Sequence, residues 1–110
     1  MTPEGRLKQQ VKKLLEERGF WRAGSAKPES VVGWYYMPVS NGMGTHGIPD
    51  FVCCWSGQFF SIETKAPNGS PTANQEKRHE EIRAAKGWIL VADHIDIVKE
   101  FLDGRYRRPS

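Results

Sequence analysis

The fold is decided by the stretch GIPDFVCCWSGQFFSIETK, which covers residues 47–65. It contains two runs rich in aromatic and apolar residues, Phe51 to Trp55 and Gln58 to Lys65, and such runs are typical of β-strands. Only Ser56 and Gly57 separate the two runs, and a two-residue connection of this kind is typical of a β-hairpin. The stretch therefore predicts two antiparallel strands joined by a tight turn.

The predicted hairpin brings three charged residues to its open end. Asp50 precedes the first strand, and Glu63 and Lys65 lie at the end of the second. Because side chains alternate between the two faces of a strand, Glu63 and Lys65 share one face. Two neighbouring carboxylates repel each other unless a proton or a cation lies between them, and Mg²⁺ prefers such oxygen ligands. The spacing indicates a metal site with a lysine beside it. The alternative is a turn aspartate next to a solvent-facing Glu/Lys pair.

Hydrophobic spacing and capping residues predict the remaining elements. Thr2-Pro3 is typical of a helix start, and Thr72 with Gln75 has the spacing of a capping box. We expect helices over residues 3–18 and 73–86, loops over 20–30 and 40–49, strands over 31–39 and 88–92, and a last helix capped by Asp93. The predicted order is α-β-β-β-α-β-α. This is one mixed α/β domain over residues 1–104, followed by a basic tail over 105–110.

The composition excludes several classes of protein. Of the 110 residues, 38% are hydrophobic and 26% are charged, a mix that argues against a disordered chain. No apolar run approaches the roughly 18–20 residues of a membrane span, and residues 1–4 lack the apolar stretch of a secretion signal. The two cysteines, Cys53 and Cys54, are adjacent, so they cannot form an ordinary disulfide with each other or a spaced zinc set. We therefore expect an intracellular protein without a membrane segment.

Basic residues are unevenly distributed along the chain. Lys and Arg total 16 and Asp and Glu total 13, so the net charge is 16 − 13 = +3. Seven basic residues lie within residues 6–27 and nine within residues 65–108. Residues 28–64 contain no Lys or Arg, and their only charged residues are acidic. The positive excess is compatible with binding to nucleic acid. The absence of basic residues from 28–64 is explained equally well by a buried central sheet.

Three polar residues on the predicted helices are further candidates. Glu4 precedes Leu7 by three residues and Val11 by seven, so it shares their apolar stripe. It is either a metal or water ligand or a favourable charge at a helix N-terminus. Gln75 either completes the capping box or donates a hydrogen bond toward the acidic site or a DNA phosphate. His79 shares a helix face with Gln75, and a packed histidine is the alternative to a catalyst there.

A set of basic residues is a candidate for contacts with DNA phosphates, and the alternative is a solvated helix surface and a frayed chain end. The set comprises Lys8, Lys12 and Lys13 in the first helix, His46 in the loop before the hairpin, and Arg105, Arg107 and Arg108 in the tail. Three consecutive aromatic residues, Trp34, Tyr35 and Tyr36, are expected in the core of the sheet, with stacking of one of them on an exposed base as the alternative.

The order of these motifs is similar to that of a known enzyme family. Gly47-Ile48-Pro49-Asp50, then Glu63-Thr64-Lys65, then Gln75 at a helix start together resemble the PD-(D/E)xK nuclease superfamily. The run over 62–67, followed by Gly69 and Thr72-x-x-Gln75, is more similar to the VRR-NUC branch (virus-type replication-repair nuclease) in its stand-alone phage form. The stretch over 41–44 and the Gly87-Trp88 pair also fit this branch. The resemblance extends from Glu4 to about Leu102.

The resemblance implies a fold and a catalytic set. The fold would be a restriction-endonuclease-like mixed sheet flanked by helices. Asp50 and Glu63 would be metal ligands together with the backbone carbonyl of Thr64. Lys65 would position or activate the attacking water. Gln75 would be the family's helix glutamine, and Glu4 would be the first-helix acid and a further metal ligand.

The resemblance also implies an activity and a partner. The reaction would be Mg²⁺- or Mn²⁺-dependent endonucleolytic hydrolysis of DNA phosphodiester bonds. It would be selective for branched DNA such as a Holliday junction. A homodimer would carry it out, in the cytoplasm of a bacterial host if the protein is phage-encoded. The alternative is a catalytically inactive DNA-binding or protein-interaction module on the same fold. The complete acid-acid-lysine set favours the enzyme.

Overall fold

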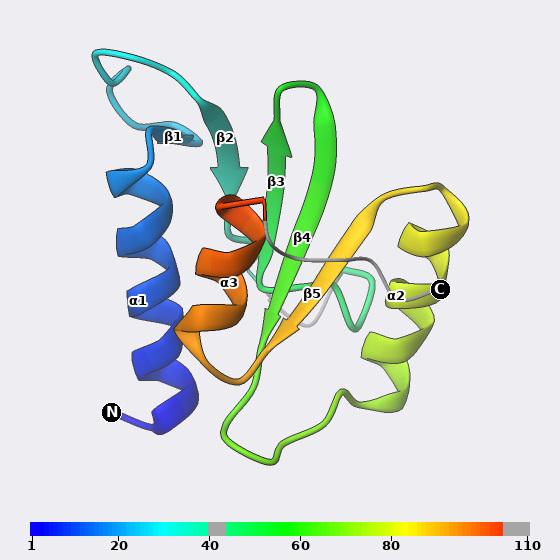
Figure 1. Ribbon diagram of the computed structural model, residues 1–110. Helices are drawn as coiled ribbons and strands as arrows, with labels where there is room; N and C mark the ends of the chain where they lie inside the picture. Colours follow the sequence, from blue (N-terminus) through cyan, green and yellow to red (C-terminus); the bar gives the residue numbers. More distant parts are fainter. Residues whose placement is uncertain (40–43, 105–110) are drawn as a thin grey trace.

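A computed structural model describes residues 1–39 and 44–104 of the chain (Figure 1). The elements follow in the order α1 (Pro3–Glu17), β1 (Phe20–Arg22), β2 (Gly33–Tyr36), β3 (Phe51–Trp55), β4 (Gln58–Thr64), α2 (Ala73–Ala84), β5 (Trp88–Ala92) and α3 (Ile95–Leu102). The predicted mixed α/β class is confirmed. Within the described residues, no helix is long and apolar enough to cross a membrane.

The five strands form one sheet in the order β1-β2-β3-β4-β5. The two outer pairs, β1 with β2 and β4 with β5, are parallel, and the two inner pairs are antiparallel. The predicted hairpin is β3 and β4, in which Phe51 lies opposite Ile62 and Trp55 lies opposite Gln58. Its turn residues Ser56 and Gly57 have φ angles of 51° and 80°, as the tightest hairpin turns require.

One strand was not expected from the sequence. Residues 20–30 were predicted as a loop, but Phe20–Arg22 form the edge strand β1 parallel to β2. The strand has three residues, so it has no periodicity to detect, and it depends on its partner. Phe20 lies opposite Gly33, where a Cβ atom would approach the phenyl ring to 2.5 Å. The close approach of β1 therefore requires the glycine in β2.

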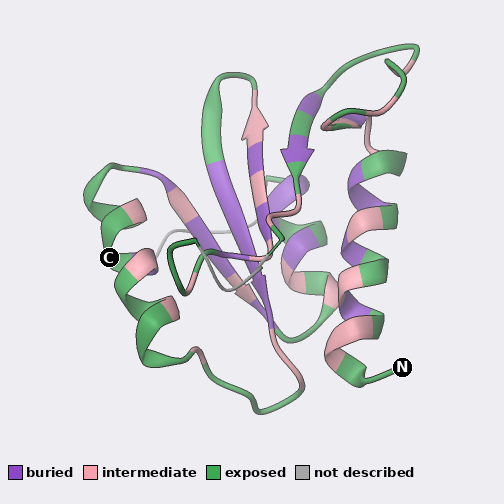
Figure 2. Cartoon of the chain, turned by 180° about the vertical axis from the view of Figure 1, so that it is seen from behind, coloured by how far each residue is buried: buried purple, intermediate pink, exposed green. Residues whose placement is uncertain are grey.

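The hydrophobic core lies on one face of the sheet. α1 and α3 cover this face, as Figure 1 shows at the left and front of the sheet, and α2 lies along the opposite face beside β5. The core contains Leu7, Val11, Leu14 and Leu15 from α1, Val98, Phe101 and Leu102 from α3, and Phe20, Tyr35, Phe51, Cys53, Phe60, Ile62, Leu90 and Ala92 from the sheet. Figure 2 shows the alternation of buried and exposed residues along β2 from behind.

The helix starts are fixed by local hydrogen bonds. The Thr2 side chain accepts from Gly5 N, and Thr72 with Gln75 forms the predicted capping box. α3 differs from expectation because its N-cap is His94, whose side chain accepts from Asp96 N, whereas Asp93 was predicted to cap it. The predicted loop over 40–49 is described from residue 44, and the tail over 105–110 lies outside the described residues.

Candidate active site

The open end of the β3–β4 hairpin carries the candidate site. Asp50 directly precedes β3, and Glu63 is the last residue but one of β4. The pairing of Phe51 with Ile62 continues to these two residues, so their backbones are neighbours across the hairpin. The Glu63 side chain is 1% exposed and that of Asp50 is 19% exposed. The structure thus brings together the two acids that the sequence predicted to converge.

Asp50 is held in place by β4 and α1. Its Oδ2 atom accepts two hydrogen bonds from Thr64, one from the backbone N at 2.9 Å and one from Oγ1 at 2.7 Å. Its Oδ1 atom lies 3.3 Å from the Nζ atom of Lys8. The sequence assigned Lys8 to contacts with DNA phosphates, and the structure places it beside the carboxylate itself. The sequence analysis missed the side-chain contribution of Thr64, which lies next to Glu63, the residue opposite Asp50 in the hairpin.

Glu63 is held by α2. Its Oε2 atom accepts a hydrogen bond from Nε2 of Gln75 at 3.0 Å, and its Oε1 atom lies 3.6 Å from Nε2 of His79. The sequence placed Gln75 and His79 on one face of this helix, and that face packs against the end of β4. His79 is 2% exposed, so it is packed against Glu63 rather than solvated. Both roles that the sequence left open for Gln75 are present, because it completes the capping box with Thr72 and also donates a hydrogen bond to Glu63.

The charges of Asp50 and Glu63 interact unfavourably. Burial, followed by the charge of Asp50, raises the pKa of Glu63 to about 8. The charge of Glu4 adds to this increase in pKa, whereas Lys65 opposes it. These effects indicate that Glu4 and Lys65 both lie within electrostatic reach of Glu63. A desolvated carboxylate next to a second one is stable only when a proton or a cation compensates its charge.

The environment of His79 disfavours its charged form. Burial lowers the pKa of His79, and the charge of Arg83 acts in the same direction. A neutral imidazole does not compensate the charge of Glu63. The compensation for Glu63 in its ionised form must therefore come from Lys65 or from a cation at the site.

The donor set fits a hard divalent cation. Oε1 of Glu63 is buried, and it has no hydrogen-bond partner among the side chains and backbone of residues 1–39 and 44–104. In the same part of the chain, no three His, Cys, Asp or Glu side chains are gathered as a ready cage for a metal. Mg²⁺ usually takes one or two protein carboxylates and completes its shell with water and substrate phosphate. The pair formed by Asp50 and Glu63 meets this requirement.

The loop before Asp50 is fixed against the start of α2. Gly47 has a φ angle of +87°, and a Cβ atom there would lie 2.3 Å from the backbone oxygen of Asn74. Nearby, Arg78 donates a hydrogen bond of 3.1 Å to the backbone oxygen of His46. The His46 side chain is exposed, so it is accessible to a ligand. These contacts connect the segment that carries Asp50 to the helix that carries Gln75.

Other predicted residues lie farther from the carboxylates. The Nζ atom of Lys13 lies 4.0 Å from Oε1 of Glu17, and both side chains are largely exposed. Lys12 lines a groove of about 290 Å³ with Arg22 and Tyr36. The predicted tail contacts Arg105, Arg107 and Arg108 lie outside the described residues.

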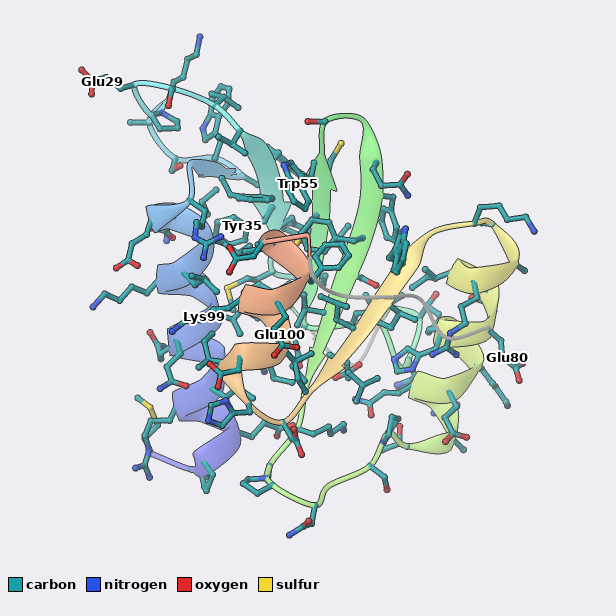
Figure 3. All side chains as sticks on the ribbon, in the orientation of Figure 1. Glu29, Tyr35, Trp55, Glu80, Lys99 and Glu100 are labelled. Atoms are coloured by element: carbon teal, nitrogen blue, oxygen red, sulfur yellow. The ribbon has the colours of Figure 1, made fainter. Side chains whose placement is uncertain are left out.

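The prediction that three aromatic residues of β2 lie in the core was wrong for two of them. Tyr35, labelled in Figure 3, is fully buried, but Trp34 is 40% exposed and Tyr36 is 45% exposed. Alternation along the strand places Tyr35 under α1 and α3 and places its two neighbours on the opposite face. α2 lies beside β5, at the other end of the sheet from β2.

Comparisons with known proteins identify the fold. No protein-family model matches the sequence, and no curated protein matches it either. A solved structure described as a VRR_NUC domain is similar, with a TM-score of 0.69 and 21% sequence identity, over 96% of this chain and 100% of that one. The predicted fold is thereby confirmed, and the chain has the fold of a VRR_NUC domain.

Proposed function

We propose that this protein is a metal-dependent DNA endonuclease that hydrolyses phosphodiester bonds in branched DNA. The observation that carries the proposal is the buried Glu63 beside Asp50, with its Oε1 atom unsatisfied within the described residues. This cation-demanding pair lies at a strand end on a VRR_NUC fold, with Lys65 in electrostatic reach.

The cofactor in this proposal is Mg²⁺ or Mn²⁺, held by Asp50, Glu63 and the backbone carbonyl of Thr64. Glu4, predicted as a further ligand, is not gathered with these two carboxylates in the described part of the chain, and it acts on Glu63 through its charge. Such an ion acts as a Lewis acid toward a phosphate oxygen and lowers the pKa of a bound water. Thr64 and Gln75 fix the orientation of the two carboxylates through the hydrogen bonds described above. Outer-shell partners of this kind set the geometry of metal ligands.

The lysine and glutamine complete the proposed catalytic set. Lys65 follows Glu63 by two residues and lies on the same side of β4, where its ammonium group would orient the attacking water and offset negative charge on the phosphate. The Nζ atom of Lys8 lies 3.3 Å from Oδ1 of Asp50 and would contact a non-bridging phosphate oxygen once the substrate is bound. Two lysines would therefore be available to the scissile phosphate.

The charge distribution favours DNA as substrate. If Glu4, Asp50 and Glu63 are metal-site carboxylates, the rest of the chain has 16 basic and 13 − 3 = 10 acidic residues, a net charge of +6. Phosphate contacts from Lys8, Lys12 and Lys13 in α1 and from the arginines of the tail would make binding strongly salt-dependent. A homodimer would present two such sites to two strands of a junction.

Cleavage of a labelled four-way junction tests the proposal. We expect nicked products with Mg²⁺ or Mn²⁺ and none with EDTA. Asp50→Ala and Lys65→Ala should abolish cutting while junction binding is retained. Lys99→Ala, on the outer surface of α3 (Figure 3), is the matched control and should cut normally. Cutting in EDTA, or full activity in Asp50→Ala, would refute the mechanism. Binding without cutting under every metal condition would identify an inactive DNA-binding module.

A further inference from the structure

Two polar atoms inside the candidate site face each other without a hydrogen bond. Oε1 of Glu63 and Nε2 of His79 lie 3.6 Å apart, and both side chains are buried. In residues 1–39 and 44–104, three buried side-chain nitrogen or oxygen atoms lack a hydrogen-bond partner, and these two are among them. Burying polar atoms unpaired costs folding free energy. The protein therefore places a stability cost directly at the proposed metal ligand.

The helix α2 directs two side chains at one carboxylate. Gln75 and His79 are four residues apart, so they lie one above the other on the same face of the helix. Nε2 of Gln75 donates to Oε2 of Glu63 at 3.0 Å, and the other oxygen, Oε1, is the one that faces His79. Each oxygen of Glu63 thus has one nitrogen of α2 beside it.

The chemistry of the two groups decides how they interact. A carboxylate that binds a metal ion is deprotonated, so both of its oxygens are acceptors only. A neutral imidazole has a single N–H donor, and a favourable contact with Oε1 requires that donor to be at Nε2. Because an oxygen has two lone pairs, accepting from His79 leaves Oε1 a second lone pair for a cation.

The distance between the atoms is compatible with such a bond. It exceeds the longest ordinary N–H···O hydrogen bond by about 0.4 Å. Hydrogen bonds in active sites are often long and reach their full strength only in the loaded complex. A small rotation of either side chain closes this gap.

Two other roles fit His79 less well. As a direct metal ligand it would have to gather with Asp50 and Glu63, but the described part of the chain holds no group of three such side chains. Mg²⁺ also prefers oxygen ligands. As a mere filler of the interior, an apolar side chain of similar size would serve without an unpaired nitrogen.

We propose that His79 is a positioning residue, which donates from Nε2 to Oε1 of Glu63 and, together with Gln75, orients this carboxylate toward the metal ion. This inference rests on the proposed metal-dependent function and adds a residue to it. Partners of this kind hold metal ligands in orientation, and their loss lowers metal affinity or activity about 10- to 100-fold.

Two substitutions of similar volume test the donor. His79→Leu removes it, whereas His79→Gln keeps an amide N–H at about the reach of Nε2. Binding of Mn²⁺ to the protein alone, without DNA, is measured by electron paramagnetic resonance. The Leu variant should bind about 10- to 100-fold more weakly, and the Gln variant should stay within about fivefold of wild type. The control Glu80→Gln, at an exposed position on α2 (Figure 3), should bind as wild type does.

Stability and DNA affinity separate positioning from packing. In EDTA, His79→Leu should melt at or above the wild-type temperature, because it removes a buried unpaired nitrogen. Its affinity for a four-way junction in EDTA should be unchanged, since His79 is buried and does not reach the DNA. With saturating Mg²⁺, the loss of cleavage should appear in kcat and leave KM unchanged. A lower melting temperature with unchanged Mn²⁺ affinity would assign His79 to packing alone.

The wild-type protein provides a test without any loss of folding. Long-range ¹H–¹⁵N spectra in saturating Mg²⁺ report which ring nitrogen of a histidine carries the proton. The signals of His79 are those that are absent from the His79→Gln spectrum. We expect the proton at Nε2.

Three outcomes would overturn the inference. These are an unprotonated Nε2 in the Mg²⁺-loaded protein, wild-type Mn²⁺ affinity in His79→Leu, and equal losses of affinity in the Leu and Gln variants. Failure of the nuclease function is a distinct result. Wild type that binds Mn²⁺, with the expected order of variants, but cuts no DNA would refute the nuclease and leave the role of His79 intact. Wild type that binds no Mn²⁺ would overturn both.

Discussion

Thr64 donates two hydrogen bonds to a single carboxylate oxygen of Asp50, from its backbone N at 2.9 Å and from its Oγ1 at 2.7 Å. Thr64 lies at the end of β4 and Asp50 at the beginning of β3, so these bonds close the open end of the hairpin. They direct the other oxygen of Asp50 toward Lys8. Thr64 lies between Glu63 and Lys65 along the chain, and it holds Asp50, which precedes the neighbouring strand β3, in place.

Replacing the Thr64 hydroxyl tests this support. Thr64→Val keeps the shape of the side chain and the backbone donor but removes the Oγ1 donor, so Asp50 loses one of its two restraints. We expect cleavage and metal affinity to fall about 10- to 100-fold, as for other outer-shell partners. Unfolding free energy should fall by about 1–2 kcal/mol. Thr64→Ser restores the donor and should recover most of the activity in a steady-state cleavage assay. Equal losses in the Ser and Val variants would exclude a role for the hydroxyl.

The two contacts of Gln75 can be separated by one substitution. In Gln75→Glu the side chain still accepts from Thr72 N and preserves the capping box, but it can no longer donate to Glu63. Below pH 8 in EDTA, where Glu63 keeps its proton and can donate it to the new carboxylate, we expect a melting temperature close to that of wild type. Cleavage should fall about 10- to 100-fold. Gln75→Ala loses both contacts, and should also be less stable by about 1 kcal/mol. A Gln75→Glu variant with wild-type cleavage would show that this glutamine is a helix cap alone.

The stability of the metal-free protein should fall as the pH rises. Because the pKa of Glu63 is raised to about 8, the folded protein keeps this proton where the unfolded chain has lost it. Between the ordinary glutamate pKa, about 4.3, and pH 8, the unfolding free energy should therefore decrease, with a maximum slope of about 1.4 kcal/mol per pH unit. Above pH 8 the folded state also ionises and the decrease ends.

Urea unfolding in EDTA across this pH range measures the effect. Glu63→Gln cannot ionise, so its profile should be flatter than that of wild type. Saturating Mg²⁺ at pH 8 should stabilise wild type and leave Glu63→Gln nearly unchanged, because binding to the folded state alone raises its stability. Parallel pH profiles for the two proteins would contradict the buried-carboxyl explanation.

Gly47 should be required for activity more than for folding. A Cβ atom at this position would lie 2.3 Å from the backbone oxygen of Asn74, so Gly47→Ala must move the loop that leads to Asp50 away from α2. We expect at least a tenfold loss of cleavage, because small displacements of catalytic groups have large effects on rate. Gly104→Ala is the matched control, since its φ is also positive (+77°) but its Cβ would have no neighbour within 4 Å.

Each alanine at positive φ costs about 1–2 kcal/mol of stability, so thermal unfolding should register both variants. Only Gly47→Ala should lose cleavage. If the two variants lose activity in proportion to stability alone, the contact between the loop and α2 has no catalytic role.

The sequence by itself determined the elements whose signals are local. The hairpin over 51–64 follows from two strand-forming runs and a two-residue turn, and the starts of α1 and α2 follow from their capping residues. The convergence of Asp50 with Glu63 also followed from the sequence, because hairpin register fixes which residues face each other.

Tertiary structure decided the features that depend on distant segments. β1 exists because Phe20 packs over Gly33, and Glu63 loses its water because α2 brings His79 and Gln75 against it. Trp34 and Tyr36 alternate with the buried Tyr35 just as core residues would, and no local pattern distinguishes a covered sheet face from an open one. Which face is covered depends on where the helices pack, and this packing leaves Trp34 and Tyr36 exposed on the face opposite α1 and α3.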